Sequence, residues 1–198
     1  LNLNKIYLEK LDYSKKNKIY ASYKSMYRQS AYHLIYTNNK VWQENQFNNT
    51  ATIGWQHSYK YINGKGVLNL ELKSSAIGSD YDFSSIIFSS IHKNKLGKFG
   101  LNSRAFAQYG SGTNWANECR LYLAGANSEE MMENKYTRAS GFVYSDWLGY
   151  GASTNHFQMG GGLNLRGYAG YLVPEINKDG QYVEAFRGES GASVSFEL

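Results

Sequence analysis

A chain of 198 residues with 42% apolar residues and 18 tyrosines is sized for one domain at most, and this composition excludes disorder as its main state. No run of about 18 apolar residues occurs in it, so these residues contain no helical membrane span. A membrane β-barrel is still possible, because its strands alternate apolar and polar residues and show no long apolar run. The net charge of +5 is scattered in short groups, which argues against a nucleic-acid partner, and the single cysteine, Cys119, excludes an internal disulfide and a zinc site.

Residues 1–40 leave the boundary of the domain open. Ile19–Tyr27 alternates as a strand does, and we predict a strand there. A helix with Ser14 as its N-cap is the alternative, because apolar residues also recur at helical spacing. These residues are Tyr20, Tyr23, Tyr27, Ala31 and Leu34.

The clearest strand pattern begins at Ala51. Odd positions from Ala51 to Tyr61 are mostly apolar or aromatic, whereas even positions are small or polar. Asn63–Gly66 tolerates the positive φ of a tight turn, and Val67–Lys73 then alternates again. This pattern predicts a β-hairpin.

The same rhythm returns further along the chain. Phe83–His92 is rich in serine and isoleucine, Asn94–Gly97 breaks the run, and Phe99–Tyr109 alternates. Cys119–Ala124 predicts a shorter strand and Gly191–Leu198 a terminal one. Strands joined by glycine-marked turns, without signals of βαβ units, predict an all-β antiparallel meander.

A long loop is predicted around residues 125–175. Ser128–Lys135 is expected to form a helical turn within it, because Glu129 and Glu130 suit the positive first turn of a helix. At roughly twenty residues per strand and turn, the chain supplies about eight to ten strands.

A soluble β-sandwich and a transmembrane barrel both fit such a meander, and the barrel fits better. Strands of about ten or more residues are long enough to cross the hydrocarbon layer at a tilt. Their polar faces carry the small and charged residues of a wet interior, and aromatic residues stand near strand ends, at Tyr59, Tyr61, Phe99 and Tyr109. The predicted fold of residues 1–198 is therefore a transmembrane antiparallel β-barrel, as a single domain or part of one.

No catalytic motif occurs in the sequence. The histidines His33, His57, His92 and His156 form no close ligand pair, and neither a G-x-S-x-G turn nor a P-loop is present. Cys119 is expected to be a small strand residue rather than a nucleophile. The sequence thus predicts no metal and no cofactor, and it leaves open whether the chain belongs to a larger enzyme.

One segment differs from the hairpins. It contains the glycine triplet Gly160, Gly161 and Gly162, followed by Leu165, Arg166, Gly167 and Tyr168. Consecutive glycines allow close packing or a sharp turn, and a lone arginine at a turn projects its guanidinium away from the strand. Inside a barrel that guanidinium needs an acceptor on the wall, whereas in a solvated hairpin it needs none.

This segment resembles the sixth-loop signature of the BamA-type superfamily of outer-membrane barrels, also called bacterial surface antigens. The matching residues are Gly161, Gly162, Leu165, Arg166, Gly167, Tyr168, Pro174, Arg187, Gly188, Glu189 and the strand Gly191–Leu198. The resemblance implies a long loop folded back into the barrel, with Arg166 clamped to the inner wall. It also implies a location in the bacterial outer membrane, with membrane lipid, polypeptide substrates and other envelope proteins as partners. Because the family continues through further strands after this motif, the chain is expected to be a partial barrel.

Three functions remain open at this point. The first is a barrel that inserts or translocates other polypeptides, with the glycine segment as its structural loop motif. The second is the membrane anchor of a larger outer-membrane enzyme, such as a peptidase, whose catalytic residues lie outside this chain. The third is a soluble β-sandwich that binds glycans or proteins through surface tyrosines.

Overall fold

The computed structural model describes residues 16–27, 45–123, 125–133, 161–165, 173–176, 182–185 and 187–198. Contacts divide the chain into two compact units. The sheet unit comprises Leu1–Arg28, Gln46–Asn114 and Ala192–Leu198, and the loop unit comprises Gln29–Asn45 and Trp115–Gly191.

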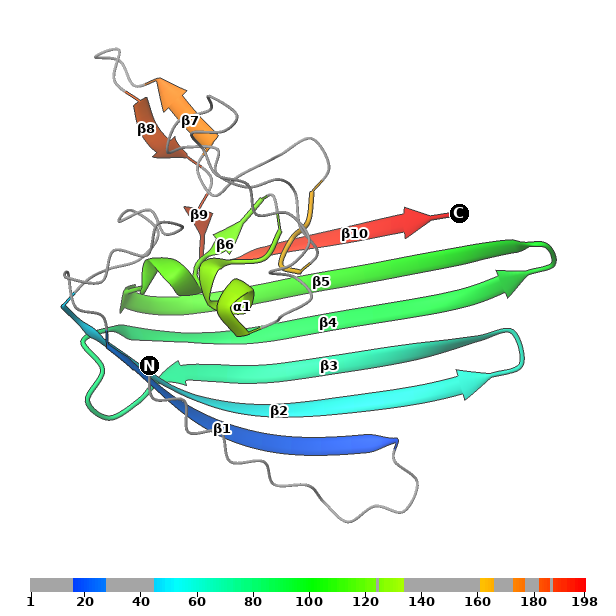
Figure 1. Ribbon diagram of the computed structural model, residues 1–198, viewed down its shortest axis with the longest axis horizontal. Helices are drawn as coiled ribbons and strands as arrows, with labels where there is room; N and C mark the ends of the chain where they lie inside the picture. The colour runs from blue at the N-terminus through cyan, green and yellow to red at the C-terminus, as the bar shows by residue number, and fades with distance from the viewer. Residues whose placement is uncertain are drawn as a thin grey trace. The chain divides into compact units, whose positions relative to one another are not determined.

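Six strands form the main sheet, in the order β1-β2-β3-β4-β5-β10 (Figure 1). They are β1 (Asn17–Tyr27), β2 (Phe47–Tyr61), β3 (Gly64–Ser75), β4 (Asp82–Leu96), β5 (Phe99–Asn114) and β10 (Gly191–Glu197). Strands β1 to β5 pair antiparallel in chain order, each with the next, and β10 is the neighbour of β5. The predicted all-β meander is thereby confirmed, and Ile19–Tyr27 is a strand rather than a helix.

The central strands are long. Strands β2 to β5 contain 15, 12, 15 and 16 residues, whereas strands of soluble sheets most often have about five or six. Short turns join β2 to β3 and β4 to β5, and the longer segment 76–81 joins β3 to β4 at the opposite end of the sheet. We call the end with the short turns the turn end.

The turn between β4 and β5 is tighter than the sequence predicts. The pairing continues through Lys95 with Gly100 and Leu96 with Phe99. Only Gly97 and Lys98 remain outside the ladder, and Gly97 adopts the positive φ of 65° that glycine tolerates. The break predicted at Asn94–Gly97 is therefore narrower than expected.

The loop unit contains short elements. They are a 3-10 turn η1 (Asn117–Cys119), β6 (Leu121–Tyr122), α1 (Ser128–Glu133), β7 (Val173–Ile176), β8 (Tyr182–Ala185) and β9 (Arg187–Gly188). Strand β6 pairs with β9, and β7 pairs with β8. The helical turn predicted at Ser128–Lys135 is confirmed over Ser128–Glu133. The strand predicted at Cys119–Ala124 is shorter, because Cys119 belongs to η1.

Most of the buried apolar side chains of the described residues lie in the loop unit. They are Trp115, Ala116, Cys119, Leu121, Tyr122, Ala126 and Leu163. The predicted long loop around residues 125–175 therefore includes the buried Ala126 and Leu163 as well as α1 and β7, while its residues 134–160 and 166–172 lie outside the described residues. Among the described residues, no helix is long and apolar enough to cross a membrane.

Candidate functional site

One face of the sheet is apolar and exposed. The register places Ile53, Leu72, Ile86 and Tyr109 side by side on β2 to β5, and these side chains are 60%, 50%, 48% and 68% exposed. The neighbouring positions on this face add Ile19, Trp55, Leu70 and Phe88. Because a soluble monomer rarely exposes so continuous an apolar surface, this apolar face requires a cover.

The opposite, polar face is the better buried one. On the rungs adjacent to the exposed isoleucines, Ser85 and Gln108 are each 6% exposed. Glu71 of the same face accepts hydrogen bonds from the Tyr20 hydroxyl and, at 2.9 Å, from Asn69 Nδ2. Met26, Phe83 and Phe106 are also buried on this face. Polar side chains are thus buried on one face while large apolar ones are exposed on the other, whereas a soluble antiparallel sheet usually exposes its polar side.

Tyrosine rings lie over glycines of the neighbouring strand. A Cβ built on Gly54 would overlap the ring of Tyr20, and one on Gly66 would stand 2.5 Å from Tyr59 Cζ. The missing side chain thus provides the space that the ring fills, which pins the register of adjacent strands.

An aromatic ladder runs along β2 at the turn end of the apolar face. Trp55, His57, Tyr59 and Tyr61 follow each other at every second residue with ring centroids 5.7, 5.6 and 6.1 Å apart. The Tyr59 hydroxyl lies 2.7 Å from His92 Nδ1, and Ser90 Oγ lies 2.7 Å from His92 Nε2. Rings that pair an apolar body with a polar tip are typical of the boundary between an apolar medium and water.

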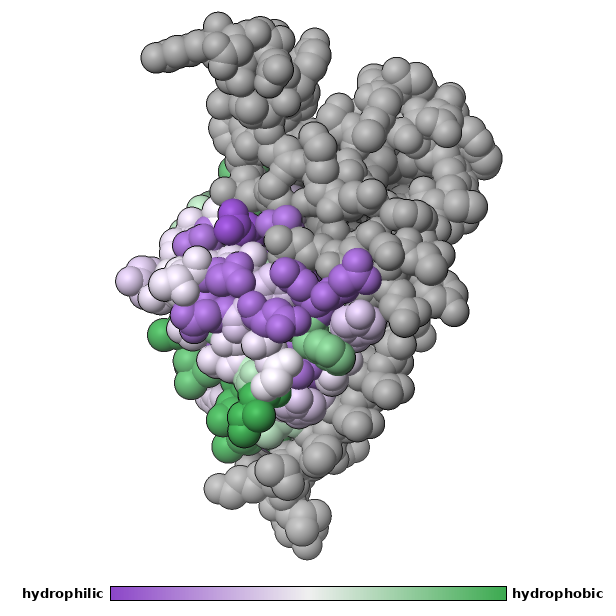
Figure 2. All heavy atoms as spheres, turned by 90° about the vertical axis from the view of Figure 1, so that its left-hand side faces the viewer, coloured by the Kyte–Doolittle hydropathy of each residue, from purple (hydrophilic) through white to green (hydrophobic). Residues whose placement is uncertain are grey.

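Polar contacts hold the opposite end of the sheet. Asn49 Nδ2 donates to the carbonyls of Ile77 and Gly78 at 3.2 and 2.8 Å. The Phe47 amide donates to Asp80 Oδ2 at 2.6 Å. Figure 2 views the molecule from this side and shows hydrophilic residues gathered apart from hydrophobic ones.

A hollow of about 350 Å³ lies on strands β2 to β5. It is lined by Ala51, Ile53, Leu72, Lys73, Ser74, Ser84, Ser85, Ile86, Tyr109 and Ser111.

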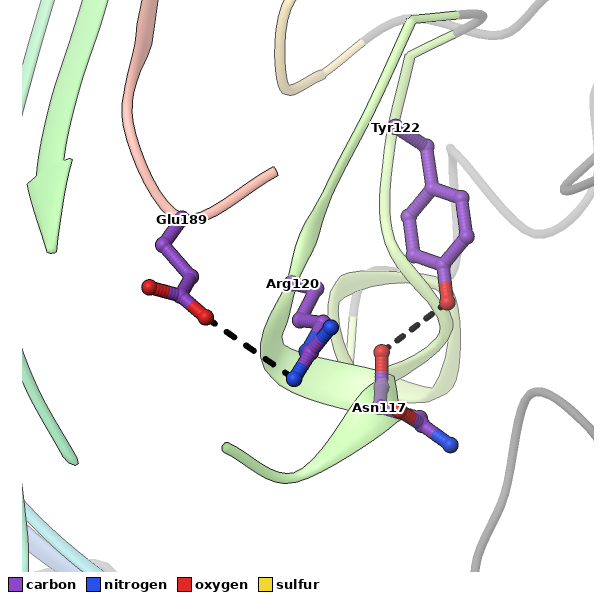
Figure 3. Close-up of polar contacts among 4 residues, drawn as sticks. All are labelled: Asn117, Arg120, Tyr122 and Glu189. Carbon is purple, nitrogen blue, oxygen red and sulfur yellow. Dashed lines mark hydrogen bonds and ion pairs between the residues drawn. The ribbon is translucent and has the colours of Figure 1, made fainter. Parts of the chain in front are cut away.

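The loop unit is held by polar contacts between its short elements. Arg120 Nη2 lies 3.8 Å from Glu189 Oε1, across the β6–β9 pair, and the Tyr122 hydroxyl donates to the Asn117 carbonyl at 2.9 Å (Figure 3). The buried Cys119 thiol donates to Glu129 Oε2 at 3.3 Å. Cys119 therefore packs as an interior residue beside a carboxylate.

The glycine segment packs closely within this unit. Gly161 and Gly162 have φ of 102° and 47°. A Cβ on Gly161 would collide with the Glu130 carboxylate, and one on Gly162 with the Gly125 carbonyl. The Leu165 amide donates to the Leu123 carbonyl at 2.8 Å, which fixes the end of this stretch.

Four of the predicted motif residues are not among the described ones. Gly160, Arg166, Gly167 and Tyr168 lie outside the described residues, so the predicted clamp of Arg166 stays a prediction. The structure does bring Gly161 and Gly162 against α1 and the segment before it. Among the described residues, no group of three or more His, Cys, Asp and Glu side chains could hold a metal ion.

Comparison of the chain with protein-family models, curated proteins and solved structures finds no match. The resemblance to the BamA-type superfamily therefore remains a prediction from the glycine segment. The Tyr20–Glu71 contact was not predicted, because its partners are separated by 51 positions and no short motif marks them.

Proposed function

We propose that the sheet unit is part of the wall of a β-barrel in the bacterial outer membrane. Its apolar face lies against lipid, and its polar face lines the interior. The observation that carries this proposal is the inverted exposure of the two faces, since lipid is the medium in which exposed Ile53, Leu72 and Ile86 are favourable. Water or side chains in the barrel interior suit the polar face.

Strand length and aromatic placement support the same proposal. A tilted strand needs about 9–11 residues to cross the hydrocarbon layer, and β3, the shortest of the central strands, has 12. The ladder from Trp55 to Tyr61 places aromatic rings toward one end of the apolar face, where a membrane interface would lie.

Within this membrane role we propose that the barrel inserts or translocates polypeptides, and that the glycine segment is its structural loop motif. The close packing of Gly161 and Gly162 on the loop unit supports an ordered segment rather than a solvated hairpin. This function needs no bond chemistry, because an unpaired strand edge or a lumen lowers the cost of moving polar backbone past lipid.

Trp55 offers a direct test of the membrane proposal. Its ring is on the apolar face and 38% exposed, whereas Trp115 of the loop unit is 3% exposed. The protein is folded into vesicles of lipid with brominated acyl chains, and tryptophan quenching is compared with that in unbrominated vesicles. We expect Trp55→Phe to remove a large part of the quenching and Trp115→Phe to leave it. Equal quenching of the wild type and Trp55→Phe would overturn the lipid-facing assignment.

A further inference from the structure

Lysines gather at the turn end of the polar face. Lys60, Lys65 and Lys93 stand directly opposite one another on β2, β3 and β4, and all are exposed. Lys95 follows two residues later on β4, and Lys98 lies in the adjoining turn. We call these residues, Lys60, Lys65, Lys93, Lys95 and Lys98, the lysine rim.

The lysine rim has no carboxylate to balance it within residues 46–114, which the structure describes throughout. The carboxylates of this range are Glu71, Asp80 and Asp82. Glu71 bonds Tyr20 and Asn69, and both aspartates lie at the opposite end of the sheet. Like charges directly opposite on neighbouring strands destabilise a sheet. An anion bound at the rim would remove this repulsion.

The position of the rim favours an anion in the barrel interior over a lipid headgroup. The Tyr59 and His92 rings alternate with Lys60 and Lys93 along the strands, so the lysines point to the other side of the sheet. In the proposed barrel that side faces the interior, and the inference rests on the proposed function in this respect.

The spacing favours an anion with several separate charges. Neighbouring strands are about 4.8 Å apart, and alternate residues of one strand are about 6.8 Å apart. In an extended peptide the side chains on one face are also about 6.8 Å apart. Acidic residues at every second position of such a peptide therefore match the spacing of Lys93 and Lys95. A single small anion contacts only some lysines of the rim, so it lacks the added affinity that several linked charges provide.

We propose that the lysine rim binds acidic segments of polypeptides at the turn-end mouth of the barrel. Such a site would recruit polypeptides by charge before they contact the wall, and its affinity would fall with salt because exposed charges are screened within about 8 Å at physiological ionic strength.

The test uses the full chain folded in zwitterionic detergent and a fluorescent peptide of alternating Glu and Ser. Binding is followed by anisotropy. We expect Lys65→Gln with Lys93→Gln to weaken binding about fivefold, on the scale of two exposed ion pairs. Lys24→Gln with Lys73→Gln removes the same charge from the same face nearer the opposite end, and we expect it to change affinity less than twofold.

Three outcomes would overturn the proposal. One is equal weakening by both double variants, which would mean attraction by net charge alone. Another is equally tight binding of a Gln/Ser peptide. The third is displacement of the acidic peptide by inorganic phosphate or by short-chain phosphatidylglycerol added to the micelles at equal charge concentration, which would assign the rim to small anions or to lipid headgroups. Because the assay contains no bilayer, its result is independent of the Trp55 quenching that tests the membrane proposal.

Discussion

Replacing Gly54 by alanine tests the contact that joins β1, β2 and β3. Tyr20, Gly54 and Glu71 share one rung, and an alanine Cβ would overlap the Tyr20 ring. The ring must move and release its hydrogen bond to Glu71. Loss of a hydrogen bond to a charged group costs about 1.5–3 kcal/mol, and overpacking costs about 1–3 kcal/mol. The same movement of the ring relieves the overlap and breaks the hydrogen bond, so the two costs do not add in full. We therefore expect Gly54→Ala to lower the free energy of unfolding by about 2–4 kcal/mol.

Urea unfolding in detergent micelles, followed by circular dichroism, measures this change. With a slope of about 2 kcal/mol per molar urea, the midpoint should fall by about 1–2 M. Gly100→Ala is the matched control, because the nearest atom to a Cβ there is the Asn94 carbonyl oxygen at 4.0 Å. We expect that variant to be neutral or to gain a few tenths of a kcal/mol, about the effect of reduced chain entropy in the unfolded state.

A double variant separates this contact from a general intolerance of alanine at position 54. In the Tyr20→Ala background the ring is gone, so Gly54→Ala should cost less than about 0.5 kcal/mol, and the two substitutions should be strongly non-additive. A cost at Gly54 that is the same with and without the Tyr20 ring would refute the reasoning.

Three further substitutions test other parts of the structure. Ile53→Lys should cost about 2–4 kcal/mol when the protein is unfolded from vesicles, as expected for a charge facing lipid, and Gln56→Lys on the polar face should cost clearly less; equal costs would contradict the assignment of the faces. Asn49→Ala should cost about 1–3 kcal/mol, because Asn49 is 6% exposed and its amide holds the carbonyls of Ile77 and Gly78; limited proteolysis should then cut within residues 76–81, and an uncut loop would count against this role. Glu189→Gln should change stability by less than about 1 kcal/mol, because the ion pair with Arg120 is 3.8 Å long and its side chains are 31% and 40% exposed; a larger loss in thermal unfolding would mean that Glu189 has a further structural role.

Alternation was enough to predict the hairpin of β2 and β3, because these two strands keep one face largely apolar, whereas Phe83–His92 was predicted from its isoleucine and serine content. The odd positions from Ala51 and the even positions of β3 meet in register, as Ile53 with Leu72 does. Alternation also favoured a strand over a helix for Ile19–Tyr27, and the whole of β1 pairs with β2. Asn94–Gly97 was read as a break because its residues favour turns, yet the ladder to β5 extends to Leu96.

Contacts between distant residues could not be predicted in this way. Tyr20 and Glu71 meet only because two registers, β1 with β2 and β2 with β3, place them on one rung, and the sequence does not specify either register. The same holds for Asn49, whose buried amide bonds the β3–β4 connection. The lysine rim could be recognised only after pairing had aligned Lys60, Lys65 and Lys93.

Arg166→Ala tests the prediction that comes from the glycine segment alone. In the sequence Arg166 directly follows Leu165, whose amide donates to the Leu123 carbonyl. A guanidinium clamped to an inner wall contributes paired hydrogen bonds that lysine cannot reproduce. We therefore expect Arg166→Ala and Arg166→Lys both to reduce protease resistance and the heat-modifiable gel band of the folded protein. Full resistance and an unchanged band in Arg166→Ala would count against the clamp, and rescue by Arg166→Lys would mean that charge alone, rather than the planar fork, holds the loop.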